Sequence, residues 1–297
     1  MSNITSTHGR YLTICLNPVI QKSLVYASLT KGEVNRTSEH RVDIAGKGIC
    51  CTRVLGQIGR EAINLTQLGG PTRDWFLAMC ATDRLDIRWV ESGSDIRFCT
   101  TLIDRAEGNA TELVEEGRRV AEGTAGRILV ELERILPEVG TVMISGTKAP
   151  GFPTDMMSEM AGRACTAGKR LFLDIKGKDL LDCLPFRPLV VKPNMDEFLQ
   201  TFAPGTVAGI GRELKEKHGS WLIVTRGALP TLFWDGDTVR ECPVLPVTAL
   251  NPTGSGDAFG AGVAAALEEG ATIAEAVAEG TRLGTLNAER LKPGSIV

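Results

Sequence analysis

A loop rich in small residues, spanning 251–262, carries the strongest chemical signal in the sequence. It reads Asn-Pro-Thr-Gly-Ser-Gly-Asp-Ala-Phe-Gly-Ala-Gly and leads into an Ala-rich stretch that is typical of a helix. Because Gly254 and Gly256 carry no Cβ, the backbone N–H groups around them can approach an anion closely. The N-terminus of a helix adds unpaired N–H groups and about half a positive charge. The loop is therefore a candidate phosphate cradle.

One carboxylate, that of Asp257, lies where this loop meets the predicted helix. A carboxylate beside anion donors can take a proton from a hydroxyl while the donors hold the charge of a transferred group. Ser255 could already cap the helix, so a structural turn does not require Asp257. The presence of this carboxylate therefore favours a catalytic role over a purely structural one. The loop predicts transfer of a phosphoryl group to a hydroxyl, and a tightly packed helix start is the structural alternative.

Two well-known phosphate-binding loops fit the sequence less well. The P-loop needs four residues between its first Gly and a Gly-Lys-Ser/Thr triplet, which the loop does not contain. The dinucleotide fingerprint is matched by Gly254 and Gly256, but Gly260 comes one position too late. No second βαβ unit follows the loop either. A dinucleotide oxidoreductase is therefore a second and less favoured interpretation.

Composition and charge restrict the class of protein further. The 297 residues are enough for one large α/β domain or two smaller ones, and 43% hydrophobic and 23% charged residues are ordinary for a soluble globular chain. The net charge is -3 and no long basic run occurs. Neither nucleic acid nor an anionic membrane is an expected partner.

The termini, apolar runs and cysteines point to a cytoplasmic protein. Met1–Arg10 is polar and lacks the apolar core of a signal peptide. No window approaches 18 uninterrupted apolar residues. The eight cysteines form no Cys-x-x-Cys pair and the three histidines lie far apart, so no zinc site is expected. Most of the cysteines lie in apolar runs and are expected to be buried.

Two pairs of segments with polar–apolar alternation predict a small, half-exposed sheet. The alternation is typical of strands with one solvated face. The first pair is separated by Lys31-Gly32 and the second by the turn Glu107-Gly108-Asn109. The predicted strands are Lys22–Ser28 and Val34–Ile44, then Arg97–Asp104 and Thr111–Val114. This sheet, formed by about 20–45 and 96–115, is expected to protrude as a lid.

The rest of the chain alternates strands with helices. The predicted strands are Tyr11–Leu16, Ala62–Leu68, Thr141–Ser145, Leu171–Ile175, Leu189–Lys192, Trp221–Thr225, Leu229–Trp234 and Thr238–Val244. The predicted helices are Gly46–Ile58, Thr124–Leu136, Thr154–Ala167, Ala258–Glu269 and Ile273–Arg290. This alternation predicts an α/β fold with a doubly wound, mostly parallel sheet, and residues 1–297 are expected to form a single domain around it.

The predicted fold places the candidate site. Ligands of open α/β sheets bind beyond the carboxyl ends of the strands. The loops after Leu16, Ile144, Ile175, Lys192 and Thr225 are therefore expected to share a crevice with Asp257, which the small sheet would cover. Because the exposed face and edges of a lid sheet invite pairing, a homodimer through the lid is expected.

A series of short motifs resembles a known family over nearly the whole chain. The motifs are Leu16-Asn17-Pro18, Gly32-Glu33-Val34-Asn35-Arg36, Gly46-Lys47-Gly48-Ile49 with Arg53 and Leu55, Thr111-Glu112-Leu113-Val114, Ser145-Gly146, Lys192-Pro193-Asn194-Met195-Asp196-Glu197, Thr225-Arg226-Gly227 and the opening loop. Each motif is weak alone, but their order and spacing are specific. Together they resemble the ribokinase-like sugar kinases of the phosphofructokinase-B type, and within them the 1-phosphofructokinase and tagatose-6-phosphate kinase branch.

The resemblance implies an ATP- and Mg²⁺-dependent kinase that acts on a small sugar or sugar phosphate such as fructose 1-phosphate or tagatose 6-phosphate. It implies that Asp257 is the catalytic base and that Gly254, Ser255 and Gly256 form the anion hole. The implied nucleotide-binding residues are Lys192, Asn194, Glu197, Thr225, Gly227 and, at the adenine pocket, Asn287, and Glu197 would organise Mg²⁺ through water. The implied substrate-binding positions are Asn17, Gln21, Gly46, Lys47, Cys50, Arg97 and Ser145.

Three departures from the family pattern fall in the implied sugar pocket. Gln21 stands where the family usually has Asp, Ala45 stands in place of the first of two glycines, and Cys50 replaces an Asn. A glutamine can donate as well as accept, and a thiol forms only weak hydrogen bonds. The departures leave open a different phosphorylated sugar or polyol as acceptor. They also leave open a degenerate kinase fold that binds a nucleotide or sugar as a sensor.

Overall fold

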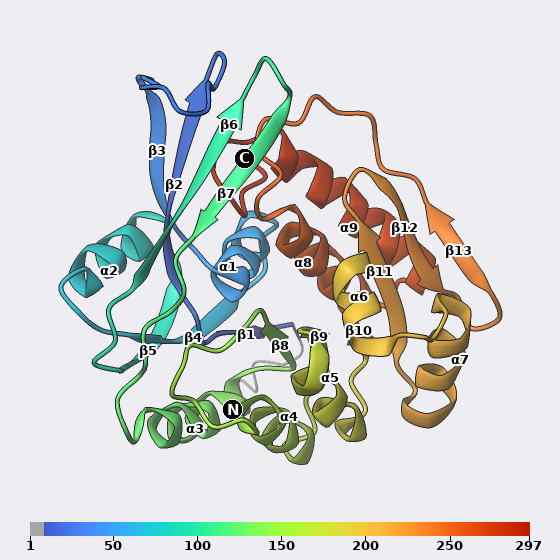
Figure 1. The fold of residues 1–297 in the computed structure, drawn as a ribbon. Coiled ribbons are helices and arrows are strands. Elements are labelled where there is room, and N and C mark those ends of the chain that lie inside the picture. Colours follow the sequence, from blue (N-terminus) through green and yellow to red (C-terminus); the bar gives the residue numbers. More distant parts are fainter. Residues whose placement is uncertain (1–8) are drawn as a thin grey trace.

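The larger of two sheets forms the body of the protein, of which the computed structural model describes residues 9–297 (Figure 1). Within these residues it has nine strands in the order β13-β12-β11-β10-β9-β8-β1-β4-β5. All neighbours from β5 to β11 pair in parallel, whereas β12 and β13 are antiparallel. The strands are β1 (Tyr11–Cys15), β4 (Ala62–Leu68), β5 (Asp86–Glu91), β8 (Thr141–Ser145), β9 (Arg170–Asp174), β10 (Val190–Val191), β11 (Trp221–Arg226), β12 (Leu229–Trp234) and β13 (Val239–Cys242). The expectation about a signal peptide concerns Met1–Arg10 and lies mainly outside the described residues.

Helices cover both faces of this sheet. One face packs on α1 (Lys47–Gln57), α8 (Ser255–Glu268) and α9 (Ile273–Ala288). The other face packs on α3 (Thr124–Ile135), α4 (Met156–Thr166), α5 (Gly177–Cys183), α6 (Met195–Phe202) and α7 (Val207–His218). The helix α2 (Arg73–Thr82) lies beside the lid, and short 3₁₀ turns occupy Leu136–Glu138 and Leu184–Phe186. No helix in residues 9–297 is long and apolar enough to span a membrane.

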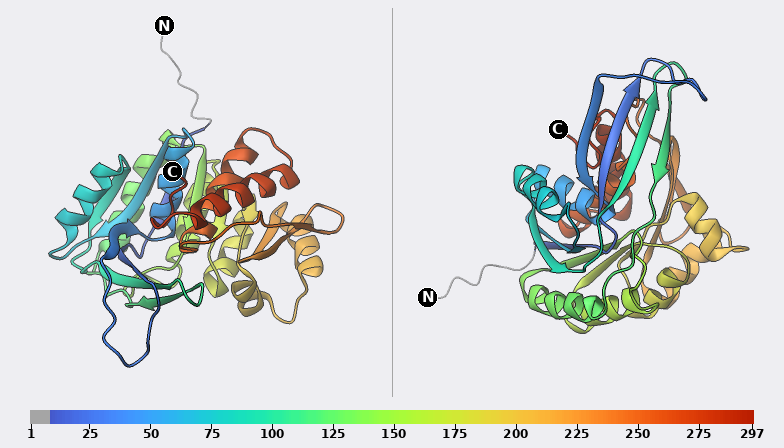
Figure 2. Two further views of the ribbon diagram at one scale, coloured as in Figure 1. Left: turned by 90° about the horizontal axis from the view of Figure 1, so that it is seen from above. Right: turned by 60° about the vertical axis from the view of Figure 1, so that its left-hand side comes forward.

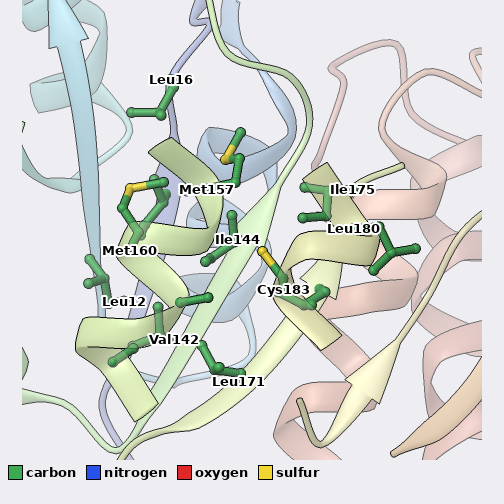
Figure 3. Packing of buried hydrophobic residues seen from close by; sticks show 14 of the residues in the cluster. Leu12, Leu16, Val142, Ile144, Met157, Met160, Leu171, Ile175, Leu180 and Cys183 are labelled. Atoms are coloured by element: carbon green, nitrogen blue, oxygen red, sulfur yellow. The ribbon is translucent and has the colours of Figure 1, made fainter. Parts of the chain in front are cut away.

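The sheet is buried on both faces because its strands are apolar at successive positions. In β8, Val142 and Ile144 join the cluster under α4, whereas Met143 points to the cluster under α1 and α8. Figure 3 shows Val142 and Ile144 among the residues of the first cluster, with Met157 and Met160 of α4. This two-sided burial is what a parallel sheet requires. Packing on both faces fixes the strands relative to one another, so that their carboxyl ends lie along one edge of the sheet.

The smaller sheet projects from the body as a separate layer (Figure 2). Its order is β3-β2-β6-β7, and the strands are β2 (Val19–Tyr26), β3 (Glu39–Ala45), β6 (Arg97–Asp104) and β7 (Asn109–Val114). The pair β2–β3 is antiparallel, as the alternation predicted, and β2 pairs with β6 in parallel. We call these four strands the lid.

The fold class predicted from the alternation is confirmed, although some boundaries were wrong. The strand expected to begin at Val34 begins at Glu39. The side chain of Asn35 explains the difference, because it accepts from Thr30 N and donates to Thr30 O, which closes a turn before the strand. The elements α2, β5, α5 and α7 were missed. In α2 only Phe76 and Cys80 are buried. Two buried positions give too short an apolar pattern to predict a helix.

The close packing of α8 against α9 generates the first prediction. A Cβ at Gly280 would lie 2.7 Å from Val263 Cγ2 and 2.8 Å from Phe259 O, whereas one at Gly126 of α3 meets nothing within 4 Å. We expect Gly280→Ala to lower the free energy of unfolding by about 1–3 kcal/mol through overpacking. The control Gly126→Ala should raise it by up to about 1 kcal/mol through helix propensity. Urea unfolding of both variants measures the difference, and equal effects would contradict the close packing.

Candidate active site

A cavity of about 940 Å³ opens between the lid and the carboxyl ends of the large sheet. It brings together most of the residues that the sequence singled out. Those that line it are Gln21, Gly46, Lys47, Cys50, Arg97, Lys192, Asn194, Glu197, Thr225, Gly227, Gly254, Ser255, Gly256 and Asp257. Asn17, Ser145 and Asn287 do not line it. The expected crevice therefore exists, but of the five loops expected in it only those after Lys192 and Thr225 line it, whereas those after Leu16, Ile144 and Ile175 do not.

The small-residue loop forms the start of α8. Gly254 is the N-cap residue with φ 85°, a conformation that favours glycine. A Cβ at this position would also lie 2.3 Å from Gly294 N, so glycine is required by contact as well as by φ. No side chain caps α8, and Ser255 therefore does not have the capping role considered from the sequence. The Ser255 N–H donates to Pro252 O and the Asp257 N–H to Gly254 O, each at 3.1 Å, so the Ser255 N–H is not free for the anion hole that the resemblance implied. In the described part of the chain, the N–H of Gly256 is left for a ligand beside Asp257.

Asn287 lies behind this loop instead of at the expected adenine pocket. Its side chain is fully buried. Its amide nitrogen donates to Thr253 O and to Ser255 Oγ, each at 3.0 Å, and its carbonyl oxygen accepts from Ser295 N at 3.0 Å. Asn287 thus joins α9, the loop and the C-terminal segment. Its neighbours Thr285 and Ala288 line the cavity in its place.

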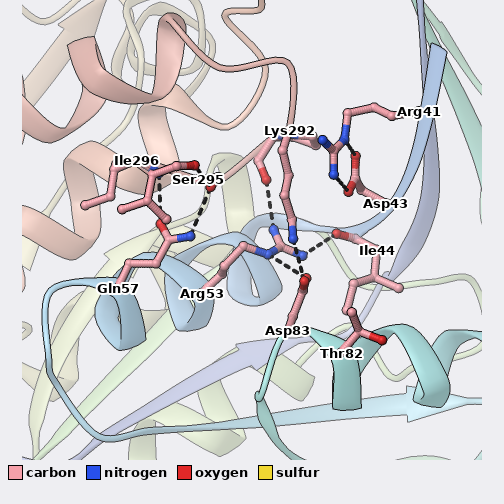
Figure 4. Close-up of polar contacts among 12 residues, drawn as sticks. Arg41, Asp43, Ile44, Arg53, Gln57, Thr82, Asp83, Lys292, Ser295 and Ile296 are labelled. Carbon is pink, nitrogen blue, oxygen red and sulfur yellow. Dashed lines mark hydrogen bonds and ion pairs between the residues drawn. The ribbon is translucent and has the colours of Figure 1, made fainter.

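Arg53 anchors the C-terminal segment that supports the loop (Figure 4). Its guanidinium, 2% exposed, donates to Pro293 O and to Ile44 O and forms an ion pair with Asp83. Asp83 also pairs with Lys292. One buried side chain therefore connects α1, the end of β3 in the lid and the segment that packs against Gly254.

A buried carboxylate that the sequence did not single out lies at the centre of the site. Asp174 at the end of β9 is 2% exposed, with Oδ1 2.8 Å from Lys47 Nζ and Oδ2 2.9 Å from Lys192 Nζ. Lys47 Nζ also lies 3.4 Å from Glu197 Oε1. The two lysines outweigh the effect of burial and lower the pKa of Asp174. The rule that ligands bind beyond strand ends could have found this residue, because it ends a predicted buried strand.

Burial and the charges around Asp257 together set the pKa of its carboxyl group. Asp257 is 7% exposed. Burial raises its pKa to about 7, with Lys47 and Lys192 opposing the rise and the charge of Asp174 adding to it. Burial lowers the pKa of Lys47, but Asp174, Glu197 and Asp257 outweigh this and raise it. A carboxyl group with a pKa near neutrality is suited to general base catalysis.

One side of the cavity is built from two loops that run next to each other. Asn194 caps α6 in a capping box with Glu197, and an isolated parallel bridge joins Asn194 to Thr225. The positive end of α6 and the turn at Gly227 therefore lie together. This is the side on which the sequence placed the nucleotide.

The opposite side is formed by the lid and the start of α1. Gln21 of β2 donates through Nε2 to Thr101 Oγ1 at 2.8 Å, and Arg97 of β6 donates to the carbonyl oxygens of Glu115 and Asn17. Asn17 itself donates to Thr147 Oγ1. Ser145 is buried in β8 next to Asp174, and its hydroxyl has no partner among the described residues.

The fold belongs to the ribokinase-like α/β class, with a lid sheet over a glycine-rich helix start. The family model described as "pfkB family carbohydrate kinase" matches residues 14–296. The chain belongs to this family, and the kinase interpretation is confirmed. Family membership implies ATP as the phosphoryl donor, generally with Mg²⁺.

Solved structures share the fold at low sequence identity. A possible 1-phosphofructokinase from Thermotoga maritima superimposes with a TM-score of 0.86 at 20% identity, covering 95% of this chain and 93% of that one. Phosphofructokinase-2 from Escherichia coli, in its complex with fructose-6-phosphate, gives 0.82 at 20% identity, with 96% of each chain covered. A ribokinase from Thermotoga maritima gives 0.73 at 21% identity, with 97% and 96% covered.

The pKa of Asp257 yields a pH prediction. Because a base must be ionised, kcat/KM for the acceptor should rise as the pH increases to about 7 and then level off. Removing the cation that lowers this pKa, with Lys47→Met, should move the midpoint to higher pH. The control Lys148→Met removes a lysine that pairs with Asp179 and should leave the midpoint unchanged. Initial rates across neutral pH, from mildly acidic to mildly alkaline, test this, and a flat profile through neutrality would exclude Asp257 as the base.

Proposed function

We propose that this protein transfers the γ-phosphoryl group of ATP to a hydroxyl of a phosphorylated sugar, with Asp257 as the catalytic base. The observation that carries the proposal is the position of Asp257. It lies in the first turn of α8, between the lid side and the Asn194–Thr225 side of one cavity. A donor bound on one side and an acceptor bound on the other would meet at this carboxylate.

The proposed step needs few protein groups. Asp257 accepts the proton of the acceptor hydroxyl, whose oxygen forms a bond to the γ-phosphorus as the bond between that phosphorus and the ADP oxygen breaks. The N–H groups at Gly254 and Gly256 would face the charge that develops on the transferred group, whereas the Ser255 N–H is held by Pro252 O. Lys192 Nζ lies close to the same turn, 3.9 Å from the place where a Cβ of Gly256 would be. Catalysis then consists of positioning and charge stabilisation.

The carboxylates of the site suit an indirectly held Mg²⁺. Asp174 is already neutralised by two lysines, and no group of three His, Cys, Asp or Glu side chains in the described chain could hold a metal alone. Glu197 and Asn194 offer oxygen atoms, which Mg²⁺ prefers, and this ion usually keeps several waters while it bridges substrate phosphates. We propose that Glu197 reaches Mg²⁺ through water. When bound, the ion would neutralise charge on the phosphates of the donor.

Arg97 is the proposed anchor for the phosphate of the acceptor. Four basic side chains line the cavity, and in the described part of the chain Lys47, Lys192 and Arg226 each pair with a carboxylate. Among residues 9–297, Arg97 donates only to carbonyl oxygens, and its Nε is buried without a hydrogen-bond partner. A guanidinium in this state is suited to a phosphate oxygen.

Replacing the base tests the function. We expect Asp257→Asn to lower kcat by about 10²–10⁴-fold, because the general base is lost while the shape of the site is kept. ATP binding, measured by calorimetry, should persist. The control Asp196→Asn changes a carboxylate of the same cavity that the proposed step does not use, and it should retain activity.

The assay is ADP release with ATP and Mg²⁺ over a panel of sugars, sugar phosphates and polyols. Wild-type turnover of a phosphorylated sugar with normal turnover by Asp257→Asn would contradict the role of Asp257. ATP binding without turnover of any acceptor would instead support a nucleotide sensor.

We also propose that two copies of the chain associate through the lid. Phe98 and Leu113 lie on the lid strands and are 38% and 53% exposed. Exposed apolar side chains on a sheet with free edges favour pairing. The double substitution Phe98→Asp and Leu113→Asp should halve the mass measured by sedimentation equilibrium, whereas Val130→Asp on α3 should not. A monomeric wild-type protein would exclude this interface.

A further inference from the structure

An apolar patch lies next to the base on the acceptor side of the cavity. Val19, Ala45, Cys50 and Cys99 pack together, each no more than 7% exposed, and all four line the cavity. We call these four residues the apolar floor. These four side chains offer the hydroxyls of a bound sugar no strong hydrogen-bonding group.

The register of the lid explains why these side chains gather. Val19 pairs with Ala45 on β3 and with Arg97 on β6, and Gln21 pairs with Cys99. Because residues two apart on a strand share a face, the cavity side of the lid carries Val19, Gln21, Arg97 and Cys99 together. Cys50 joins them from the first turn of α1, which follows β3 directly.

The floor adjoins the reacting position. Cys50 lies near Asp257, because burial and then the charge of that carboxylate raise the pKa of the Cys50 thiol and keep it protonated. Behind it, a Cβ at Gly294 would lie 2.4 Å from Cys50 Cβ, so there is no space into which Cys50 could withdraw. An acceptor whose hydroxyl faces Asp257 must therefore place other carbons of its skeleton against this floor.

The polar groups nearest the floor lie at its edge and are partly engaged. One N–H of Gln21 Nε2 donates to Thr101 Oγ1, which leaves its second N–H and Oε1 for a ligand. Glu112 accepts from Thr253 Oγ1 at 2.8 Å. Lys47 is held by Asp174 and Glu197. Over the floor itself an acceptor hydroxyl would meet only methyl groups and two thiols. It would lose its hydrogen bonds to water and gain no equivalent partner.

We infer that the acceptor is a deoxygenated sugar phosphate or polyol phosphate, an inference that rests on the proposed function. Its phosphate binds Arg97, one hydroxyl faces Asp257 and a second donates to Gln21 Oε1. A carbon without a hydroxyl lies against Val19, Cys50 and Cys99. The floor thus selects against hydroxylated acceptors, as a site does when it leaves a polar group without a partner.

Matched acceptor pairs test the inference. Fructose 1-phosphate and fructose 6-phosphate are each compared with their 3-deoxy and 4-deoxy counterparts, all of which keep the hydroxyl to be phosphorylated. We expect one deoxy compound to exceed its parent about tenfold or more in kcat/KM and in affinity. Affinity is measured by calorimetry on the wild-type protein with a non-hydrolysable ATP analogue and Mg²⁺. Parents that bind as well as or better than all the deoxy compounds, or a failure of all of them to bind, would overturn the inference.

Substitutions in the floor add a second readout. Cys50→Asn places a polar amide in the floor and should reverse the ratio between deoxy compound and parent, whereas Cys80→Asn, which changes a buried cysteine of α2, should leave the ratio unchanged in the protein that remains folded. An unchanged ratio in a folded Cys50→Asn variant would also overturn the inference. A deoxy preference in binding without ADP release would contradict the proposed function and leave the acceptor class standing.

Discussion

The ion-pair cluster of Lys47, Asp174 and Lys192 is the constraint on which the rest of the site depends. A charge as deeply buried as that of Asp174 is costly unless it is paired. Its partners come from the start of α1 and from the residue that follows β10, whereas Asp174 itself ends β9. The packing of α1 against the ends of β9 and β10 is therefore favourable when it brings these three charges together. Removing Asp174 would leave the buried ammonium of Lys192 without its carboxylate partner.

The same cluster controls the chemistry. Two lysines and two aspartates share one buried region, so the carboxylate with both partners, Asp174, stays ionised while Asp257 has its pKa raised to about 7. Two carboxyl groups in one site thus acquire different tasks from their surroundings. Asp174 organises the lysines, and Asp257 remains available to exchange a proton. The lid, joined to α1 through Arg53, forms one side of the cavity that holds both carboxylates.

Much of the fold and part of the site follow from local sequence. The α/β alternation was readable because each strand is a short apolar run between helices with apolar periodicity. The glycine turn at the start of α8 was readable because Gly254 needs a positive φ and Asp257 follows it closely. In contrast, α2 and α7 bury few side chains and were missed. Asn287 was assigned to an adenine contact, but its side chain is consumed by three hydrogen bonds that no local pattern reveals.

The sequence by itself therefore determined the glycine turn and the helix start of the proposed reaction centre, because their conformation depends on adjacent residues. Only the tertiary structure decided what surrounds that centre. Lys47 and Asp174 are 127 positions apart in the chain, and Cys51 Sγ contacts the carbonyl oxygen of Asp257 across 206 positions. Strand order and lid register bring such residues together, and they also place the apolar floor beside Asp257. The acceptor that fits the pocket depends on these long-range contacts, because the residues that line a pocket come from distant segments of the chain.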